Sequence, residues 1–171
     1  MVSDKMGIDQ IDCRIMDLIQ KKPNLTHTQI ASKVNRSQPT IGMRIKKLEN
    51  LGILKYQAGI NMKVADLCFA RIELQTKNPN IVAEVVKKCP YMINMFRLSG
   101  ERNVSILLVG VNYKFLDKVV NIHFRNRPEV VNVHMDIIED VVQDFVLPLN
   151  LNFNKHLNDK CCCGKCECGS K

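Results

Sequence analysis

Residues 26–54 contain two short amphipathic segments joined by a tight turn, and this pattern constrains the fold of the chain more than any other. Apolar residues recur at spacings of three, four or seven, which is the period of one helix face: Ile30, Val34, Ile41, Ile45 and Leu48. The Asn-Arg-Ser sequence at 35–37 interrupts the run, so the spacing predicts two helices. Two helices joined by so short a turn form a helix-turn-helix.

Both predicted helices carry end signals. Thr26 and Ser37 are expected to cap them, because a hydroxyl can accept a hydrogen bond from an otherwise unpaired N–H in the first turn. Pro39 suits the first turn of the second helix, where no N–H donor is needed. Gly52 is expected to end that helix, since glycine tolerates a left-handed conformation.

The side of the second helix that points away from its apolar stripe is basic. Between residues 33 and 55, six Lys and Arg stand against one acid, Glu49. A basic helix favours DNA as a ligand, because each Lys or Arg that neutralises a DNA phosphate releases bound counterions and this release favours binding. We expect Lys46 and Lys47 to contact phosphates. Base edges are expected to be reached by Gln38, Thr40 and Arg44, and a thymine methyl group by Met43. The predicted DNA-contacting residues are Arg36, Ser37, Gln38, Thr40, Met43, Arg44, Lys46 and Lys47.

The segment from Ile8 to Leu54 resembles the N-terminal domain of the Lrp/AsnC (feast/famine) transcription regulators. The matching positions keep an unbroken register: Ile8, Asp9, Ile11, Asp12, Ile15, Leu18, Ala31, Ser37, Thr40, Ile41, Arg44, Ile45, Leu48, Gly52 and Ile53. The extended residues 53–60 are interpreted as a wing or a linking strand. The resemblance implies a winged helix-turn-helix that binds double-stranded DNA.

Alternating and helical patterns predict a second domain with the order βαββαβ. The expected strands are 69–75, 91–98, 104–111 and 130–138. One expected helix is capped by Asn80, runs from Ile81 through Val86 and is ended by Cys89-Pro90; the other is 113–125. This is the ferredoxin-like plan. The predicted fold class is therefore α+β, a winged helix-turn-helix followed by a ferredoxin-like domain. The predicted boundaries are 1–60 for the DNA-binding domain, 61–67 for a linker, 68–150 for the αβ domain and 151–171 for a Cys-rich tail.

The second domain also resembles the effector-binding and assembly domain of the same family. The resemblance places an effector region at Gly100 and Asn103, where the family usually has Asp in place of Asn103. Val133 and Met135 stand where the family often has a Thr-x-Thr pattern. These departures remove partners for an amino-acid ligand. Assembly alone and binding of a different small molecule therefore stay open as alternatives.

The resemblance implies homodimers and rings of dimers, such as an octamer. Residues 141–149 are expected to form an extra edge strand that pairs with a partner subunit. A two-fold dimer suits two DNA half-sites about one helical turn apart, or multiples of that. Since the chain has no apolar run of the roughly 20 residues that a membrane span needs and no signal-peptide pattern, it is expected in the cytoplasm, associated with the nucleoid.

Five cysteines crowd the C-terminal tail, in C-x-x-C and C-x-C spacings. Thiolates so spaced can bind one soft cation, and four satisfy tetrahedral zinc. Zinc, copper(I) or an iron-sulfur cluster is one interpretation, a redox-reactive thiol cluster is a second, and a tail without a role is the third. The predicted ligands are Cys161, Cys163, Cys166 and Cys168, with Cys162 as the alternative.

Two rival functions remain at this stage. Some proteins with the same two-domain plan are sirohaem decarboxylases, which need His and Arg around a cavity; the available residues are His123, His134, Arg125 and Arg127. A metal- or thiol-binding architectural protein is the other rival. The sequence has no nucleophile–base set and no phosphate-binding Gly loop, so the chain is expected not to be an enzyme.

Overall fold

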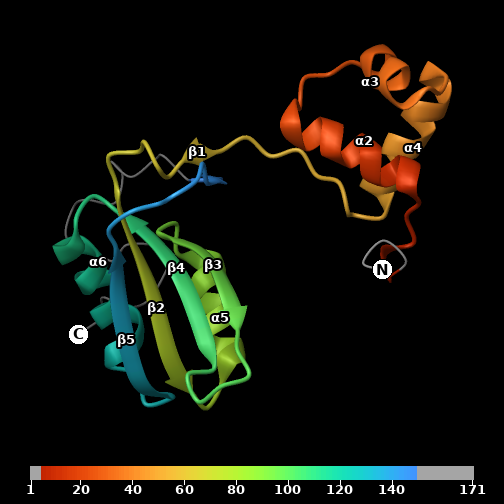
Figure 1. The fold of residues 1–171 in the computed structure, drawn as a ribbon. Helices are drawn as coiled ribbons and strands as arrows, with labels where there is room; N and C mark the ends of the chain where they lie inside the picture. Colours follow the sequence, from red (N-terminus) through yellow and green to blue (C-terminus); the bar gives the residue numbers. More distant parts are fainter. Residues whose placement is uncertain (1–4, 150–171) are drawn as a thin grey trace. The chain divides into compact units, whose positions relative to one another are not determined.

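The computed structural model describes residues 5–149. The chain divides into two compact units after Gln57 (Figure 1). Each unit has its own buried core, and the units are described separately.

The first unit is built from three helices, α2 (Gln10–Lys21), α3 (His27–Val34) and α4 (Gln38–Asn50). Their apolar faces meet in one core, which includes Ile15, Ile30, Ile41, Ile45 and Leu48. These are the positions that the helical period marks as inward-facing, so the prediction of a helix-turn-helix from 26 to 54 is confirmed.

The predicted helix ends are confirmed as well. The hydroxyl oxygen of Thr26 accepts a hydrogen bond from the Gln29 N–H and caps α3. Ser37 caps α4 in the same way, and Gly52 follows α4 with a φ of 69°. The wing differs from the prediction, because residues 53–59 contain no strand. The segment contacts the core of the first unit through Leu54, which is buried, and through the partly buried Ile53.

The second unit contains a four-stranded antiparallel sheet with the order β3-β4-β2-β5. Its strands are β2 (Cys68–Thr76), β3 (Met92–Arg97), β4 (Val104–Gly110) and β5 (Val130–Ile138). The central strands are β2 and β4, which are the first and third strands of this sheet along the chain, as the ferredoxin-like plan requires. The predicted fold class is confirmed.

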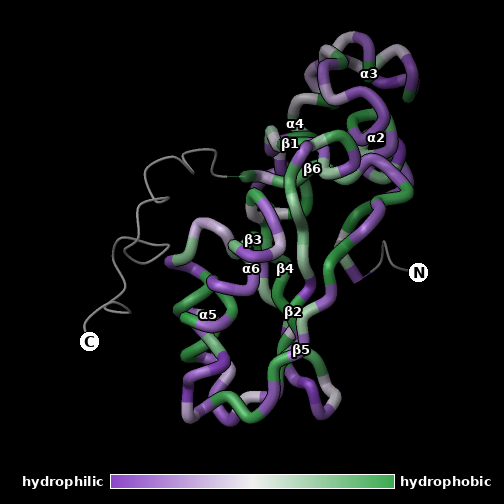
Figure 2. The backbone as a smooth tube through the Cα atoms, turned by 90° about the vertical axis from the view of Figure 1, so that its left-hand side faces the viewer, coloured by the Kyte–Doolittle hydropathy of each residue, from purple (hydrophilic) through white to green (hydrophobic). Residues whose placement is uncertain are grey.

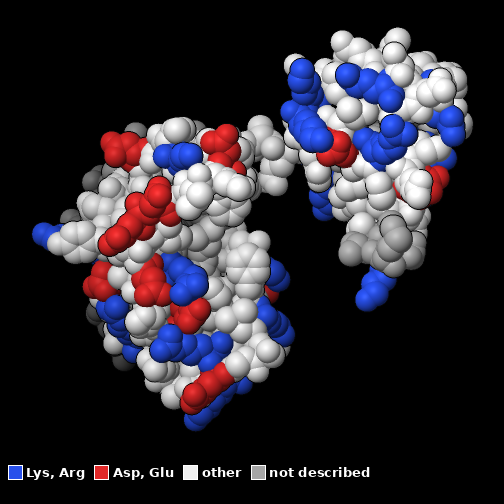
Figure 3. All heavy atoms as spheres, viewed as in Figure 1, with Lys and Arg blue, Asp and Glu red and all other residues white. Residues whose placement is uncertain are grey.

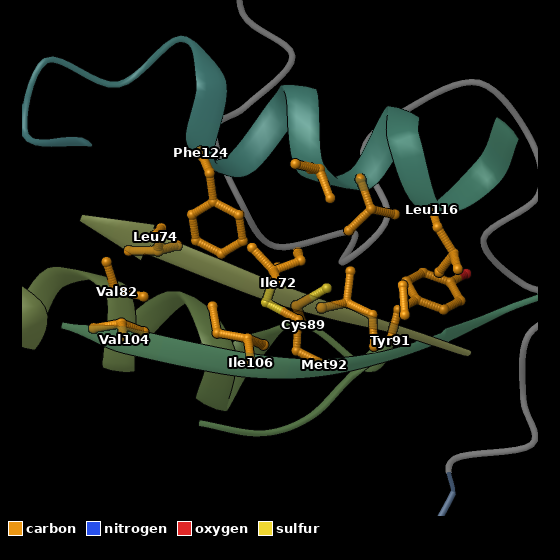
Figure 4. Packing of buried hydrophobic residues seen from close by; sticks show 14 residues of the cluster. Ile72, Leu74, Val82, Cys89, Tyr91, Met92, Val104, Ile106, Leu116 and Phe124 are labelled. Carbon is orange, nitrogen blue, oxygen red and sulfur yellow. The ribbon is translucent and has the colours of Figure 1, made fainter. Parts of the chain in front are cut away.

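One face of this sheet is covered by helices. They are α5 (Pro79–Lys88), α6 (Tyr113–Val120) and the π-helix η1 (Asn121–Arg125). Phe124 and Leu116 point from the helix layer onto β2 and β4, where Ile72 and Ile106 are fully buried (Figure 4). Hydrophilic and hydrophobic residues recur in turn along α5, as expected for a helix that buries one face (Figure 2).

Two details of these helices correct the sequence-based expectations. Asn78, rather than Asn80, caps α5, and its side-chain oxygen accepts a hydrogen bond from the Asn80 N–H. The expected helix 113–125 changes to π-helical geometry after Val120. The hydrophobic period continues through this change, which is why the pattern alone predicted one continuous helix.

A smaller apolar cluster lies on the other face of the sheet, around Phe69, Val109 and Met62. It is closed by a two-stranded sheet in which β1 (Ile60–Asn61) pairs with β6 (Val146–Leu147). The strand expected over 141–149 is therefore shorter than predicted. Only two of those residues are in a strand, and they pair with a segment of their own chain.

None of the helices in residues 5–149 is long and apolar enough to cross a membrane.

Candidate nucleic-acid interface

The exposed side of α4 carries most of the residues predicted to contact DNA. Gln38, Met43 and Lys46 are exposed there, and Arg36 is exposed in the turn before the helix. Met43 is 68% exposed, although it is a large apolar side chain. Among the charged residues on the face seen in Figure 3, Lys and Arg prevail on the first unit, whereas both signs of charge are mixed on the second unit.

Ser37 and Thr40 are joined to each other at the start of α4. Their hydroxyl oxygens are 2.7 Å apart, and Ser37 Oγ also accepts a hydrogen bond from the Thr40 N–H at 3.4 Å. Ser37 therefore has a capping role in the structure. Each hydroxyl keeps further hydrogen-bonding capacity for a ligand.

Arg44 and Lys47 are bound by carboxylates of α2. Arg44 Nη1 lies 2.7 Å from Asp9 Oδ2 and 2.7 Å from Asp12 Oδ1. Lys47 Nζ lies 3.0 Å from Asp12 Oδ2 and donates to the Gly7 carbonyl oxygen at 3.3 Å. We call Asp9, Asp12, Arg44 and Lys47 the α2–α4 charge cluster. Its two acids and two bases balance, so both cations are already compensated within the protein.

Asp12 is the buried centre of this cluster, with a side-chain exposure of 0%. A buried carboxylate is stable only when it is paired and hydrogen-bonded. Burial raises the pKa of Asp12, but hydrogen bonds from Arg44 and Lys47 outweigh this effect, and its pKa lies below the usual value. The backbone N–H of Asp12 and the guanidinium of Arg44 lower the pKa of Asp9, and the Asp9 and Asp12 carboxylates raise that of Arg44.

The two acids were not among the predicted site residues. Asp9 and Asp12 form a reciprocal capping box at the start of α2, with Asp9 Oδ1 accepting from the Asp12 N–H at 2.8 Å. The spacing does carry a signal for Asp12, because positions 12, 15 and 19 lie on one face of α2 and the other two are buried Ile. A carboxylate in such a position requires a cation from another segment.

The predicted effector-region residues lie at the hairpin between β3 and β4. Gly100 is exposed in the turn, and a Cβ atom added there would meet no atom within 4 Å. The Asn103 side chain binds the backbone of Thr76, accepting from its N–H at 3.0 Å and donating to its carbonyl at 2.8 Å. The Asn103 amide is thus used within the fold.

The residues proposed for the decarboxylase alternative do not converge. His123 is buried on the helix-covered side of the sheet. His134 is opposite Glu73 on the other face, is exposed, and pairs with Asp136 at 2.9 Å. Arg125 binds Asp117 at 2.7 Å.

The predicted metal ligands, Cys161 to Cys168, lie outside the described residues. Within residues 5–149, no group of three or more His, Cys, Asp or Glu side chains is arranged to hold a metal ion. Cys89 is buried in the main core of the second unit, while Cys13 and Cys68 are half-buried against the cores, as expected for small apolar side chains.

Comparison with known proteins agrees with this geometry. Residues 8–55 match a family model described as winged helix-turn-helix DNA-binding. The chain is 31% identical to an uncharacterised HTH-type transcriptional regulator of Pyrococcus abyssi over 107 residues, which cover 58% of this chain and 69% of the relative. It is 21% identical to the HTH-type transcriptional regulator LrpC of Bacillus subtilis over 140 residues, or 80% of this chain and 95% of LrpC.

Solved structures share this fold over about four fifths of the chain. The B. subtilis LrpC structure superposes with a TM-score of 0.68 at 19% identity, covering 80% of this chain and 97% of LrpC. The E. coli AsnC structure gives a TM-score of 0.66 at 17% identity, with 82% and 97% covered. Both sequence relatives are named as HTH-type transcriptional regulators and not as enzymes. The chain belongs to the Lrp/AsnC family of DNA-binding transcription regulators.

Proposed function

We propose that this protein is a sequence-specific regulator that binds DNA as a homodimer or as a ring of dimers such as an octamer. The observation that carries the proposal is the exposed face of α4, where Lys46 and Arg36 have no acidic partner among the described residues while Gln38 and Met43 stand free beside them. Cations without partners supply affinity for phosphates, and the other side chains supply contacts to base edges. Such a protein acts at the chromosome, within the nucleoid.

The far face of the αβ sheet supports self-association. Helices cover only one face, and the opposite face carries a patch of alternating charge in which Arg71 binds Asp136 at 3.1 Å and Arg102 binds Glu73 at 3.2 Å. A two-fold interface must be self-complementary, and a patch with both signs of charge can pair with its own copy. Phe96 adds an apolar side chain that is 53% exposed on the edge strand β3.

The tail is proposed as a second, regulatory element. Cys161, Cys163, Cys166 and Cys168, or Cys162 in place of one of them, would hold zinc, copper(I) or an iron-sulfur cluster. The support is the spacing alone, since crowded thiolates favour soft cations. Oxidation of the same thiols is the alternative chemistry. Either change would alter DNA affinity through the assembly.

In vitro selection from random DNA, followed by binding measurements at several salt concentrations, tests the proposed function. A palindromic consensus bound far more tightly than random DNA is the expected result. Weak binding that depends on salt but not on sequence would contradict it and would indicate an architectural protein.

Repeating the measurement after chelation, and with Cys163→Ser/Cys166→Ser, tests the role of the tail. Unchanged DNA affinity and unchanged assembly would exclude its regulatory role.

Sedimentation at several protein concentrations tests the assembly. Arg71→Glu places three acids together on the sheet face, so it should dissociate the oligomer. Lys114→Glu, an exposed substitution in α6 on the helix side, is the matched control and should leave the assembly unchanged. Equal effects of the two variants would contradict the proposed interface.

A further inference from the structure

An open hollow of about 330 Å³ lies between α2 and α4 on the first unit. Three of its lining residues, Thr40, Met43 and Arg44, are predicted base-reading positions. Asp9 and Lys47 complete the lining. The hollow thus places base-reading side chains of α4 directly beside the α2–α4 charge cluster.

The guanidinium of Arg44 is held at only one of its nitrogens. Nη1 makes both carboxylate contacts, at 2.7 Å each. Within residues 5–149, Nε and Nη2 make no hydrogen bond. They form the second edge of the planar group, with three further N–H donors. The side chain is 25% exposed and lines the open hollow.

An arginine fixed in this way is prepared for bidentate recognition. The two parallel N–H donors of a guanidinium edge match guanine O6 and N7, which is the commonest specific contact in the major groove. A side chain that is already fixed loses less conformational freedom on binding. Asp12 holds Arg44 in place, because its carboxylate is buried and pairs with both Arg44 and Lys47.

The neighbouring acid favours a base over a phosphate as the ligand. Asp9 is 53% exposed beside Arg44, and an exposed carboxylate repels phosphate. A carboxylate instead accepts a hydrogen bond from the N4 amino group of cytosine. Arg44 and Asp9 together therefore match the two partners of one G·C pair.

We infer that Asp12 is a positioning residue for DNA recognition, holding Arg44 so that its free edge, with Asp9 beside it, reads a G·C base pair in each half-site. The inference rests on the proposed sequence-specific binding, and it adds which base pair is read and which buried group makes this reading possible.

Selection profiles of the full chain and of Asp12→Asn test it. The wild-type consensus is expected to contain a G·C pair whose replacement by A·T weakens binding roughly tenfold or more. Asp12→Asn keeps the size of the side chain but removes the charge that holds Arg44. It should lose preference at that base pair while keeping preference at the other positions of the site. A purely structural role would lower affinity for all sequences equally.

Two further variants keep the test informative if Asp12→Asn folds poorly. Arg44→Lys retains the positive charge and loses the planar edge, so it should lose the same base preference. Asp17→Asn is the matched control and should change nothing, because Asp17 is an exposed acid of α2 that pairs with the exposed Lys21 at 2.8 Å. Thermal melting followed by circular dichroism establishes which variants are folded.

The outcomes separate this inference from the proposed function. Wild-type binding with no sequence preference would overturn the proposed function and this inference with it. A specific wild-type site whose profile is unchanged in folded Asp12→Asn or in Arg44→Lys would overturn this inference alone.

Discussion

The Asn103 side chain and the Thr76 backbone form a closed pair of hydrogen bonds at the end of the β2–β4 ladder. The Asn103 amide oxygen accepts from the Thr76 N–H at 3.0 Å, and its nitrogen donates to the Thr76 carbonyl at 2.8 Å. The last backbone pair of the ladder is Leu74 with Val104, so the amide continues the pairing by one step. Thr76 is 4% exposed, and its backbone polar groups therefore need these partners.

Asn103→Asp should destabilise the αβ unit although the side chains have the same shape. A carboxylate can accept from the Thr76 N–H, but it leaves the Thr76 carbonyl facing a second acceptor. The expected loss is about 1–3 kcal/mol in the free energy of unfolding, measured by urea denaturation. Asn132→Asp, in an exposed position of β5, is the control and should lie within about 0.5 kcal/mol of the wild type. A neutral Asn103→Asp would show that the amide donor has no energetic role.

Lys46 and Lys47 are adjacent in α4 but should contribute differently to DNA binding. Lys46 is exposed without an acidic partner in the described chain, whereas Lys47 binds Asp12 at 3.0 Å. Lys46→Ala should reduce the slope of log K against log salt by about 1. Lys47→Ala should leave the slope nearly unchanged and lower the melting temperature, because Asp12 loses a compensating charge. Equal slopes for the two variants would contradict the conclusion that Lys46 is available to phosphates while the charge of Lys47 is compensated by Asp12.

The α2–α4 charge cluster should make the stability of the first unit depend on acid pH. The folded-state pKa values of Asp9 and Asp12 lie below those of the unfolded chain. Their contribution is therefore fully present above the unfolded aspartate pKa of about 3.9 and is lost as the pH falls through the folded values. The melting temperature should stay nearly constant from pH 6 to about pH 4 and decrease at lower pH. This decrease should be smaller in Asp9→Asn. An identical pH profile in this variant would assign the dependence to other carboxylates.

Gly59 should be intolerant of a side chain. A Cβ atom there would lie 2.5 Å from the Leu147 carbonyl oxygen and 2.9 Å from a methyl group of Val146. Gly59→Ala should break the β1–β6 pairing and cost about 1–3 kcal/mol of stability. Gly100→Ala is the matched control, since nothing lies within 4 Å of its added Cβ and the change should be neutral or slightly stabilising. Faster hydrogen exchange at the Met62 N–H, which donates to the Phe145 carbonyl, would report the loosened pairing.

Much of the fold was predictable from local pattern. The caps at Thr26 and Ser37, the inward positions of the helix-turn-helix and the order of strands in the αβ unit all agree with the structure. These features depend on residues that are close in sequence, where helix period, strand alternation and capping chemistry act directly. Local pattern does not distinguish Asn78 from Asn80 as the cap of α5, because both side chains are chemically able to cap a helix.

The tertiary structure decided which distant residues meet. Sequence periodicity placed Arg44 and Lys47 on the basic helix, but only packing of α2 against α4 brings the buried Asp12 within 3.0 Å of both cations. Packing also joins β6 to β1 and separates His123 from His134 across the sheet. Local chemistry sets which helices and strands form, whereas the free energy of burying a charge or closing a sheet edge depends on partners that only the folded chain brings together.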